Sequence, residues 1–259
     1  MLAIVLLILI ILTVCTHAKN HVVLISTSRN WVNYRHSENV HRFYTLLHHS
    51  KSHENQIITF LAHEYQLDPR NSRSKKALFS DLVPTFSQLD VSINTIESVL
   101  TQQSHLISPV LTSTNNSNVL LYITGHGATN HLKIHNQALL SSHKLYNIVS
   151  RMKFGKLLIV LDTCAGASMF LAFPSSLSNV VAISSSDYEE DSYSTDFDLK
   201  LGVFTVDRFT KGLVDVLSRN RYSSVFDLGR VLTKTKIGST VTINRFSVEG
   251  DWIWSDFIG

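Results

Sequence analysis

Residues 118–127 read NVLLYITGHG, and residues 156–167 read KLLIVLDTCAGA. Each stretch is an apolar run without polar alternation, and such runs are typical of strands buried on both faces of a parallel sheet. A glycine-flanked histidine, His126, follows the first run, and a cysteine, Cys164, follows the second. The carboxyl ends of parallel strands meet at one edge of a sheet, where binding sites form. The two stretches therefore predict an imidazole and a thiol at the same edge.

The surrounding sequence supports an α/β fold. Apolar runs at 21–26, 56–61 and 179–184 predict three further strands, and helix-compatible stretches lie at 37–49, 93–102, 141–152 and 204–217. Strands that alternate with helices indicate a parallel sheet covered on both faces. Residues 184–198 are acidic and rich in serine, and we expect either a cleft wall or a solvated surface loop there.

The first eighteen residues, MLAIVLLILIILTVCTHA, predict a secretory signal peptide. An uncleaved membrane anchor is the alternative, but the apolar run is shorter than a comfortable membrane span. Residues 19–259 would then form one catalytic domain. Cys15 lies in the signal, so Cys164 would be the only thiol of the mature chain and could form no internal disulfide.

Composition excludes several classes of function. With 259 residues and 44% hydrophobic content the chain fits one globular domain. The formal net charge is only +3 and no basic stripe stands out, so we expect no nucleic-acid partner. The thirteen histidines are scattered without a zinc-ligand spacing such as HExxH. We therefore predict no metal and no other cofactor.

Cys164 and His126 fit the needs of nucleophilic catalysis. A thiol nucleophile needs a nearby imidazole that takes its proton and later protonates the leaving group. The N–H of Gly127 could face the developing oxyanion, with the N–H of Cys164 as a second donor. A helix starting just after Cys164 would favour the thiolate. Taken alone, a buried cysteine is usually an inert, small hydrophobic residue, and a histidine between glycines is usually a turn residue. The combination of both at strand ends favours catalysis.

At this point the sequence resembles the caspase-hemoglobinase clan of cysteine peptidases. Within that clan it is similar to the legumain-like family, and in particular to the catalytic subunits of glycosylphosphatidylinositol (GPI) transamidases. Beyond the two catalytic loops, the segments that carry the resemblance are 26–36 (STSRNWVNYRH), 68–71 (DPRN), 164–169 (CAGASM), 184–192 (SSSDYEEDS), 202–210 (GVFTVDRFT) and 255–259 (SDFIG).

The resemblance implies a three-layer α/β/α sandwich with a central mostly parallel, caspase-like sheet. It implies that Cys164 attacks the carbonyl at the anchor-attachment site of a precursor protein, with His126 as general base and acid. Asn33 matches the residue that orients this histidine. Ser185 and Asp191 lie in the segment similar to a substrate-contacting loop, which makes them candidates for substrate binding. The amine of a preformed GPI glycolipid would then resolve the thioester.

The implied enzyme works in a membrane complex of the endoplasmic reticulum, on its lumenal side, with the other transamidase subunits as partners. Leu67 stands where the family usually has a cysteine that bridges to a partner, and no C-terminal membrane helix is apparent, so we expect non-covalent association. Glu189 stands where the substrate loop usually has glycine. Glu54 and Asp90 lie near the place of family metal-binding carboxylates, but the match is too loose to predict a metal.

The sequence is also compatible with two other functions. A free legumain-like asparaginyl endopeptidase shares the chemistry up to the thioester and differs in using water to resolve it. A catalytically inactive scaffold would be expected to lack the cysteine or the histidine, and both are present. The segments at 26–36, 68–71 and 202–210 favour the transamidase.

Overall fold

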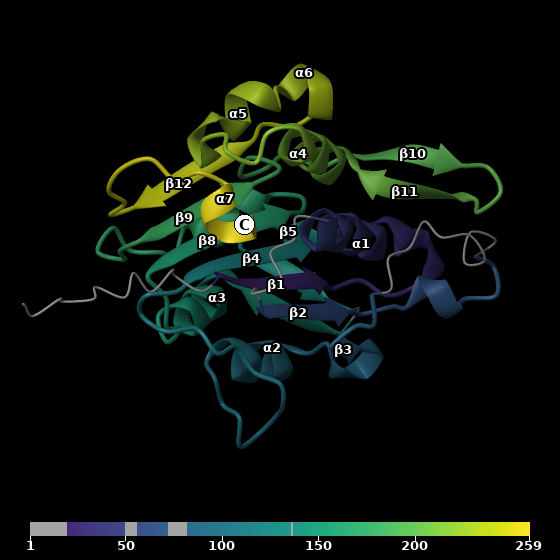
Figure 1. The fold of residues 1–259 in the computed structure, drawn as a ribbon. Helices are drawn as coiled ribbons and strands as arrows, with labels where there is room; N and C mark the ends of the chain where they lie inside the picture. The colour runs from purple at the N-terminus through teal and green to yellow at the C-terminus, as the bar shows by residue number, and fades with distance from the viewer. Residues whose placement is uncertain (1–19, 50–55, 72–81, 136) are drawn as a thin grey trace, which may run out of the picture.

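The computed structural model describes residues 20–49, 56–71, 82–135 and 137–259. The predicted signal peptide and Glu54 lie outside the described residues. The centre of the fold is a seven-stranded sheet of order β12-β9-β8-β4-β1-β2-β3 (Figure 1). Its strands are β1 (Asn20–Ser26), β2 (Gln56–Leu61), β3 (Phe86–Ser87), β4 (Asn118–Thr124), β8 (Lys156–Asp162), β9 (Val180–Ser184) and β12 (Thr242–Phe246). Only β12 runs antiparallel to its neighbour among these described strands.

Alternate side chains of the central strands enter two separate cores. Val23 and Ile25 of β1 join one apolar cluster, and Val22 and Leu24 join the other. Successive side chains of a strand point to opposite faces, so a strand buried on both sides must be apolar throughout. This confirms the interpretation of the unbroken apolar runs.

Helices cover both faces of the sheet (Figure 1). The longer α helices are α1 (Tyr34–His49), α2 (Ile93–Leu100), α3 (Ser142–Val149) and α4 (Arg208–Arg219), and the single turns are α5 (Leu228–Val231), α6 (Lys234–Ile237) and α7 (Ser255–Ile258). Side chains of α1, α4 and α7 belong to one core and those of α2 and α3 to the other. The predicted three-layer α/β/α sandwich with a mostly parallel central sheet is therefore confirmed.

Capping side chains fix where two of the helices begin. The Oγ atom of Ser92 accepts the N–H of Thr95 at 3.1 Å at the start of α2, and the Oγ atom of Ser141 accepts the N–H of Lys144 at 3.1 Å at the start of α3. A serine in this position satisfies one of the backbone donors that the first turn leaves free.

The region after β9 differs from the sequence-based expectation. The helix-compatible stretch at 204–217 is not helical from its start: β11 (Val203–Asp207) comes first and α4 begins only at Arg208. β11 pairs antiparallel with β10 (Ser194–Asp198), so the expected loop at 184–198 ends in a strand (Figure 1). At its start exposed Phe204 lies between buried Val203 and Thr205, the alternation that a strand produces.

A small antiparallel sheet follows His126 directly. It consists of β5 (Gly127–Ala128), β6 (His131–Ile134) and β7 (Ala138–Ser141). The N–H of Lys133 donates to the His126 carbonyl at 2.8 Å. No helix within the described residues is both long and apolar enough to span a membrane.

Candidate active site

The register of two neighbouring strands brings the histidine and cysteine loops together. β4 and β8 pair in parallel, with Thr124 opposite Asp162 at their carboxyl ends. His126 and Cys164 each follow these residues by two positions. The N–H of Gly125 donates to the Asp162 carbonyl at 3.3 Å, which ties the two loops at their base.

Gly127 allows the loops to pack closely. A Cβ atom at this position would lie 2.7 Å from the Cys164 carbonyl oxygen and 2.3 Å from Thr163 Oγ1. Both distances are too short for a side chain, so glycine is needed for the close approach of the backbone. The loop that contains Gly127 therefore lies directly against the cysteine loop. The role of the Gly127 N–H as a donor to the oxyanion stays a prediction.

Asn33 contacts the ring of the histidine. It ends the 3-10 helix η1 (Trp31–Asn33), and its Oδ1 atom lies 2.8 Å from His126 Nε2. Its Nδ2 atom donates to the Arg29 carbonyl at 2.7 Å, which assigns the amide orientation. The oxygen can only accept, so His126 Nε2 carries the proton in the neutral ring. Nδ1 is then the nitrogen with a lone pair.

The ring of His126 is neutral at rest. Burial, followed by the positive charges of Arg35 and Lys133, lowers the pKa of His126 below its ordinary value. Each of these causes disfavours the imidazolium form. At neutral pH the ring can therefore accept a proton, as a general base must.

The thiol of Cys164 is also neutral at rest. Burial raises the pKa of Cys164; the N–H of Ser192, 3.4 Å from Sγ, opposes this rise, and the charge of Asp191 adds to it. The expected helix dipole is weak, because Ala165 is left-handed (φ 51°) and only the five-residue 3-10 helix η4 (Gly166–Phe170) follows. The helix that follows Cys164 is thus a short 3-10 helix, and burial of the thiol favours its neutral form.

The two residues predicted to bind substrate lie in different environments. Ser185 is buried; its hydroxyl donates to Ser192 Oγ at 3.0 Å and accepts the Thr163 N–H at 3.1 Å. Asp191 is exposed, next to the cysteine loop. The substrate-binding role of both stays a prediction.

A buried polar network beneath the site was not predicted. The His36 ring lies edge-on to His126, with ring centroids 5.1 Å apart, and its Nε2 is 3.7 Å from an Asp207 carboxylate oxygen. Arg35 donates to the other Asp207 oxygen at 2.9 Å. Burial and the neighbouring Asp162 raise the pKa of Asp207 to about 7, although Arg35 opposes this. The network therefore holds a buried carboxyl group whose pKa is raised by its surroundings.

Asp162 links this network to the cysteine loop. Its Oδ1 accepts the hydroxyl of Ser192 at 3.0 Å, and its Oδ2 accepts that of Thr210 at 2.6 Å. Burial raises the pKa of the Asp162 carboxyl. The residues of this network lie in the segments 26–36, 156–167 and 202–210 that the sequence analysis singles out, but the sequence alone gives them no role.

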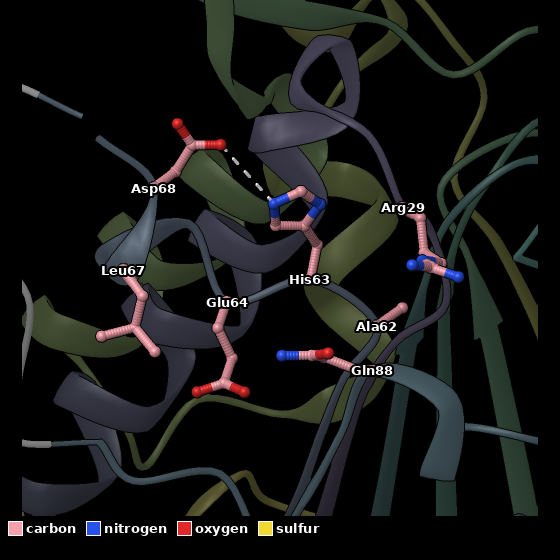
Figure 2. Close-up of a pocket in the computed structure, with 7 residues that line it drawn as sticks. All are labelled: Arg29, Ala62, His63, Glu64, Leu67, Asp68 and Gln88. Atoms are coloured by element: carbon pink, nitrogen blue, oxygen red, sulfur yellow. Dashed lines mark ion pairs between the residues drawn. The ribbon is translucent and has the colours of Figure 1, made fainter. Parts of the chain in front are cut away.

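A pocket of about 260 Å³ lies beside the loop that holds Asn33 (Figure 2). Its lining residues are Arg29, Ala62, His63, Glu64, Leu67, Asp68 and Gln88. The carboxylate of Asp68 lies 3.8 Å from His63 Nε2. Leu67, where the resemblance expects a bridging cysteine, is 74% exposed. Among the described residues, no group of three or more His, Cys, Asp or Glu side chains is placed to hold a metal ion.

A covered parallel sheet with a thiol and an imidazole at neighbouring strand ends defines the class of caspase-like cysteine peptidases. The fold is similar to the crystal structure of caspase-1 from Spodoptera frugiperda, with a TM-score of 0.55, 8% sequence identity and coverage of 90% of this chain and 88% of that one. Residues 20–225 match the model of the peptidase C13 family, and the chain belongs to this family.

Curated relatives of the chain are GPI-anchor transamidases. The Saccharomyces cerevisiae GPI-anchor transamidase is 30% identical over 250 residues, which cover 89% of this chain and 60% of that protein. The Homo sapiens GPI-anchor transamidase is 31% identical over 245 residues, covering 86% and 61%. The chain thus spans about three fifths of the length of these relatives.

Proposed function

We propose that this chain is the catalytic subunit of a GPI transamidase. The observation that carries the proposal is its similarity to GPI-anchor transamidases over most of the chain. The hydrogen bond between Asn33 and His126, beside the cysteine loop, supports it with a geometry suited to nucleophilic catalysis. In this proposal Cys164 is the nucleophile, His126 the general base and acid, and Asn33 the residue that orients the imidazole.

The first half-reaction forms a thioester. The Cys164 thiol gives its proton to His126 Nδ1 as the sulfur attacks the precursor carbonyl, and the resulting oxyanion faces the N–H of Gly127. The imidazolium then protonates the leaving amine as the C–N bond breaks. The C-terminal signal peptide leaves, and the precursor remains bound to the sulfur. Asn33 holds the proton on Nε2 throughout, which keeps Nδ1 available.

The second half-reaction transfers the acyl group to the GPI anchor. The amine of the GPI attacks the thioester, and His126 accepts its proton. The C–S bond breaks, and the proton returns to the sulfur. The products are the anchored protein and the free thiol, so no external oxidant or reductant takes part.

A reporter assay tests the nucleophile and the base. In cells that lack their own subunit, Cys164→Ser and His126→Ala should abolish GPI anchoring of a reporter, because each removes one half of the proton-transfer pair. His143→Ala is the matched control, since His143 is exposed on α3. Anchoring by the folded Cys164→Ser variant would show that the nucleophile is assigned wrongly.

The second candidate function is a free asparaginyl endopeptidase, which the membership of the peptidase C13 family supports. The two functions share the thioester and differ in the acceptor. The purified chain can be given a peptide with an internal asparagine and no glycolipid. Rapid multiple turnover without partners would favour the endopeptidase, whereas a transamidase subunit should turn over slowly.

The proposed function places the domain in the lumen of the endoplasmic reticulum, next to membrane-bound partner subunits. Leu67 replaces the bridging cysteine of the family, so the association in this proposal is non-covalent. A tagged chain should bring down other membrane subunits from detergent extracts, and these should separate without reductant on a denaturing gel. Purification of the chain alone under mild conditions would contradict the partner assignment.

A further inference from the structure

The carboxylate of Glu190 ties the loop at 185–192 to a distant segment. Its Oε2 accepts the N–H of Thr240 at 2.6 Å and that of Asp187 at 3.2 Å. Its Oε1 accepts the hydroxyl of Thr240 at 3.0 Å and forms an ion pair with Lys234. Burial acts to raise the pKa of Glu190, but these donors together lower it to about 2. The group is therefore ionised under all ordinary conditions.

The backbone beside this anchored side chain contacts both Cys164 and the residue that follows it. The carbonyl of Glu190 accepts the N–H of Ala165 at 2.7 Å. Two residues further on, the N–H of Ser192 points at Cys164 Sγ at 3.4 Å. Ala165 has a φ of 51°, a left-handed conformation that a residue with a side chain holds only when its surroundings fix it. The hydrogen bond to Glu190 is one such constraint.

We propose that Glu190 is a positioning residue for Cys164. Its carboxylate holds the loop so that the Glu190 carbonyl fixes the turn after the cysteine and the Ser192 N–H faces the sulfur. Glu190 itself touches no reacting atom, and the inference rests on the proposed role of Cys164 as nucleophile. The loop at 185–192, expected to line the substrate site, thus has a second role in supporting the nucleophile.

The charge at Glu190 and its hydrogen bonds have opposite effects on the thiol. Loss of a nearby negative charge would make the thiolate easier to form, whereas loss of the Ser192 N–H would make it harder. Glu189 provides the matched control, because it carries the same charge one residue away and is exposed. The direction in which the pKa of the Cys164 thiol changes therefore distinguishes a positioning role of Glu190 from an effect of its charge alone.

The experiment measures the rate of Cys164 alkylation by iodoacetamide between pH 5 and 10, with peptide mass spectrometry to identify the site. In Glu190→Gln the apparent pKa of the thiol should rise by roughly one pH unit, the loss expected of a hydrogen bond to a charged group. Glu190→Ala should show a larger rise, and Glu189→Gln none. Thermal denaturation checks that each variant is folded.

With a peptide substrate, Glu190→Gln should lower kcat about tenfold and leave KM within about twofold. If the apparent pKa in folded Glu190→Gln is unchanged, or falls as charge removal alone predicts, the positioning role is wrong. Because glutamine has the same shape as glutamate, Glu190→Gln tests the positioning role even if the alanine variant does not fold. Alkylation needs neither precursor nor glycolipid, so its outcome is independent of the reporter test of the proposed function.

Discussion

At the scale of single residues, the site combines a neutral thiol with a neutral imidazole. Burial raises the pKa of Cys164 and lowers that of His126, so both shifts favour the uncharged pair. The hydrogen bond to Asn33 then decides which nitrogen can accept the proton. In the proposed mechanism, this neutral pair becomes reactive when the proton passes from the thiol to the imidazole during attack.

We predict that Asn33→Asp raises the pKa of His126. A carboxylate that accepts the Nε2 proton stabilises the imidazolium, whereas the amide of asparagine carries no charge. The imidazole would then become protonated at a higher pH, and the acidic limb of the pH–rate profile should move to higher pH by roughly one unit.

The measurement is kcat/KM for peptide cleavage across pH 5 to 9. Asn147→Asp serves as the control, because Asn147 is exposed on α3 and the same charge is added. An identical acidic limb in both variants would show that Asn33 does not contact the imidazole in the working enzyme.

At the scale of elements, the edge formed by β4 and β8 depends on glycine at position 127. We predict that Gly127→Ala lowers kcat by about a hundredfold, because the new methyl group must push the cysteine loop away. Gly229→Ala is the control, since a Cβ atom there would lie at an ordinary 3.6 Å from its nearest neighbour. Peptide turnover and thermal denaturation measure the two effects; full activity of folded Gly127→Ala would contradict the close packing.

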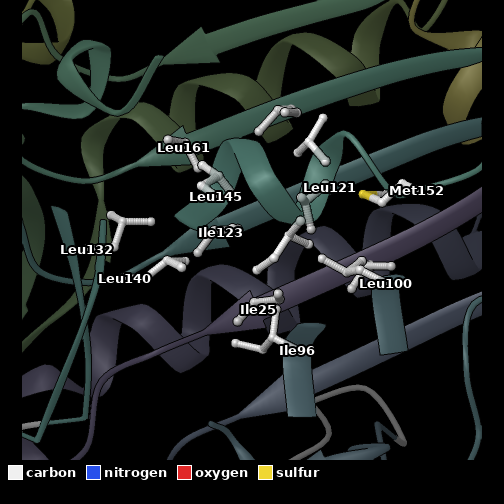
Figure 3. Close-up of a cluster of buried hydrophobic side chains, with 14 of the residues drawn as sticks. Ile25, Ile96, Leu100, Leu121, Ile123, Leu132, Leu140, Leu145, Met152 and Leu161 are labelled. Atoms are coloured by element: carbon white, nitrogen blue, oxygen red, sulfur yellow. The ribbon is translucent and has the colours of Figure 1, made fainter. Parts of the chain in front are cut away.

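The strands themselves depend on burial at both faces. We predict that Leu121→Ala lowers the free energy of unfolding by about 2–5 kcal/mol, because Leu121 is fully buried in the core shown in Figure 3. Leu139→Ala removes the same atoms from a side chain that is 59% exposed, and it should change the free energy of unfolding by less than about 0.5 kcal/mol. Urea denaturation measures the free energy of unfolding of both variants. Equal losses in the two variants would mean that this apolar cluster does not stabilise the sheet.

The central strands are predictable from the sequence, whereas β11 is not. The apolar runs of β4 and β8 were long enough to show burial on both faces, and their ends located Cys164 and His126. The sequence does not separate β11 from the helix that follows, because the five residues of β11 run directly into the helical pattern of α4. The contact of His126 with Asn33 joins residues 93 positions apart, and only the family resemblance suggested it.

At the scale of the whole molecule, stability should depend on the buried carboxyl of Asp207. Burial and Asp162 raise its pKa to about 7 in the folded state, from an unfolded value of 3.8. Between these values the folded state binds more protons than the unfolded state, so stability falls as the pH rises through this window and levels off above about 7. The protonated carboxyl of Asp207 stabilises the folded state, and this contribution is lost when the carboxyl ionises.

We therefore predict that the wild-type protein loses more Tm between pH 5 and pH 8 than Asp207→Asn does, because asparagine cannot ionise. Asp215→Asn is the control, as Asp215 is exposed on α4. Differential scanning fluorimetry at several pH values measures the slopes. Parallel profiles for wild type and Asp207→Asn would show that this carboxyl does not titrate in the window.

The register of β4 against β8 also determines which changes in chain length the site can absorb. Thr124 pairs with Asp162, and the histidine and cysteine each stand two residues beyond. Insertions between the two strands lengthen only the connection, whereas one extra residue inside either strand would turn its following loop to the other face of the sheet. Distant homologues are therefore better recognised by the offset of the histidine and of the cysteine from the strands that precede them than by the number of residues between the two.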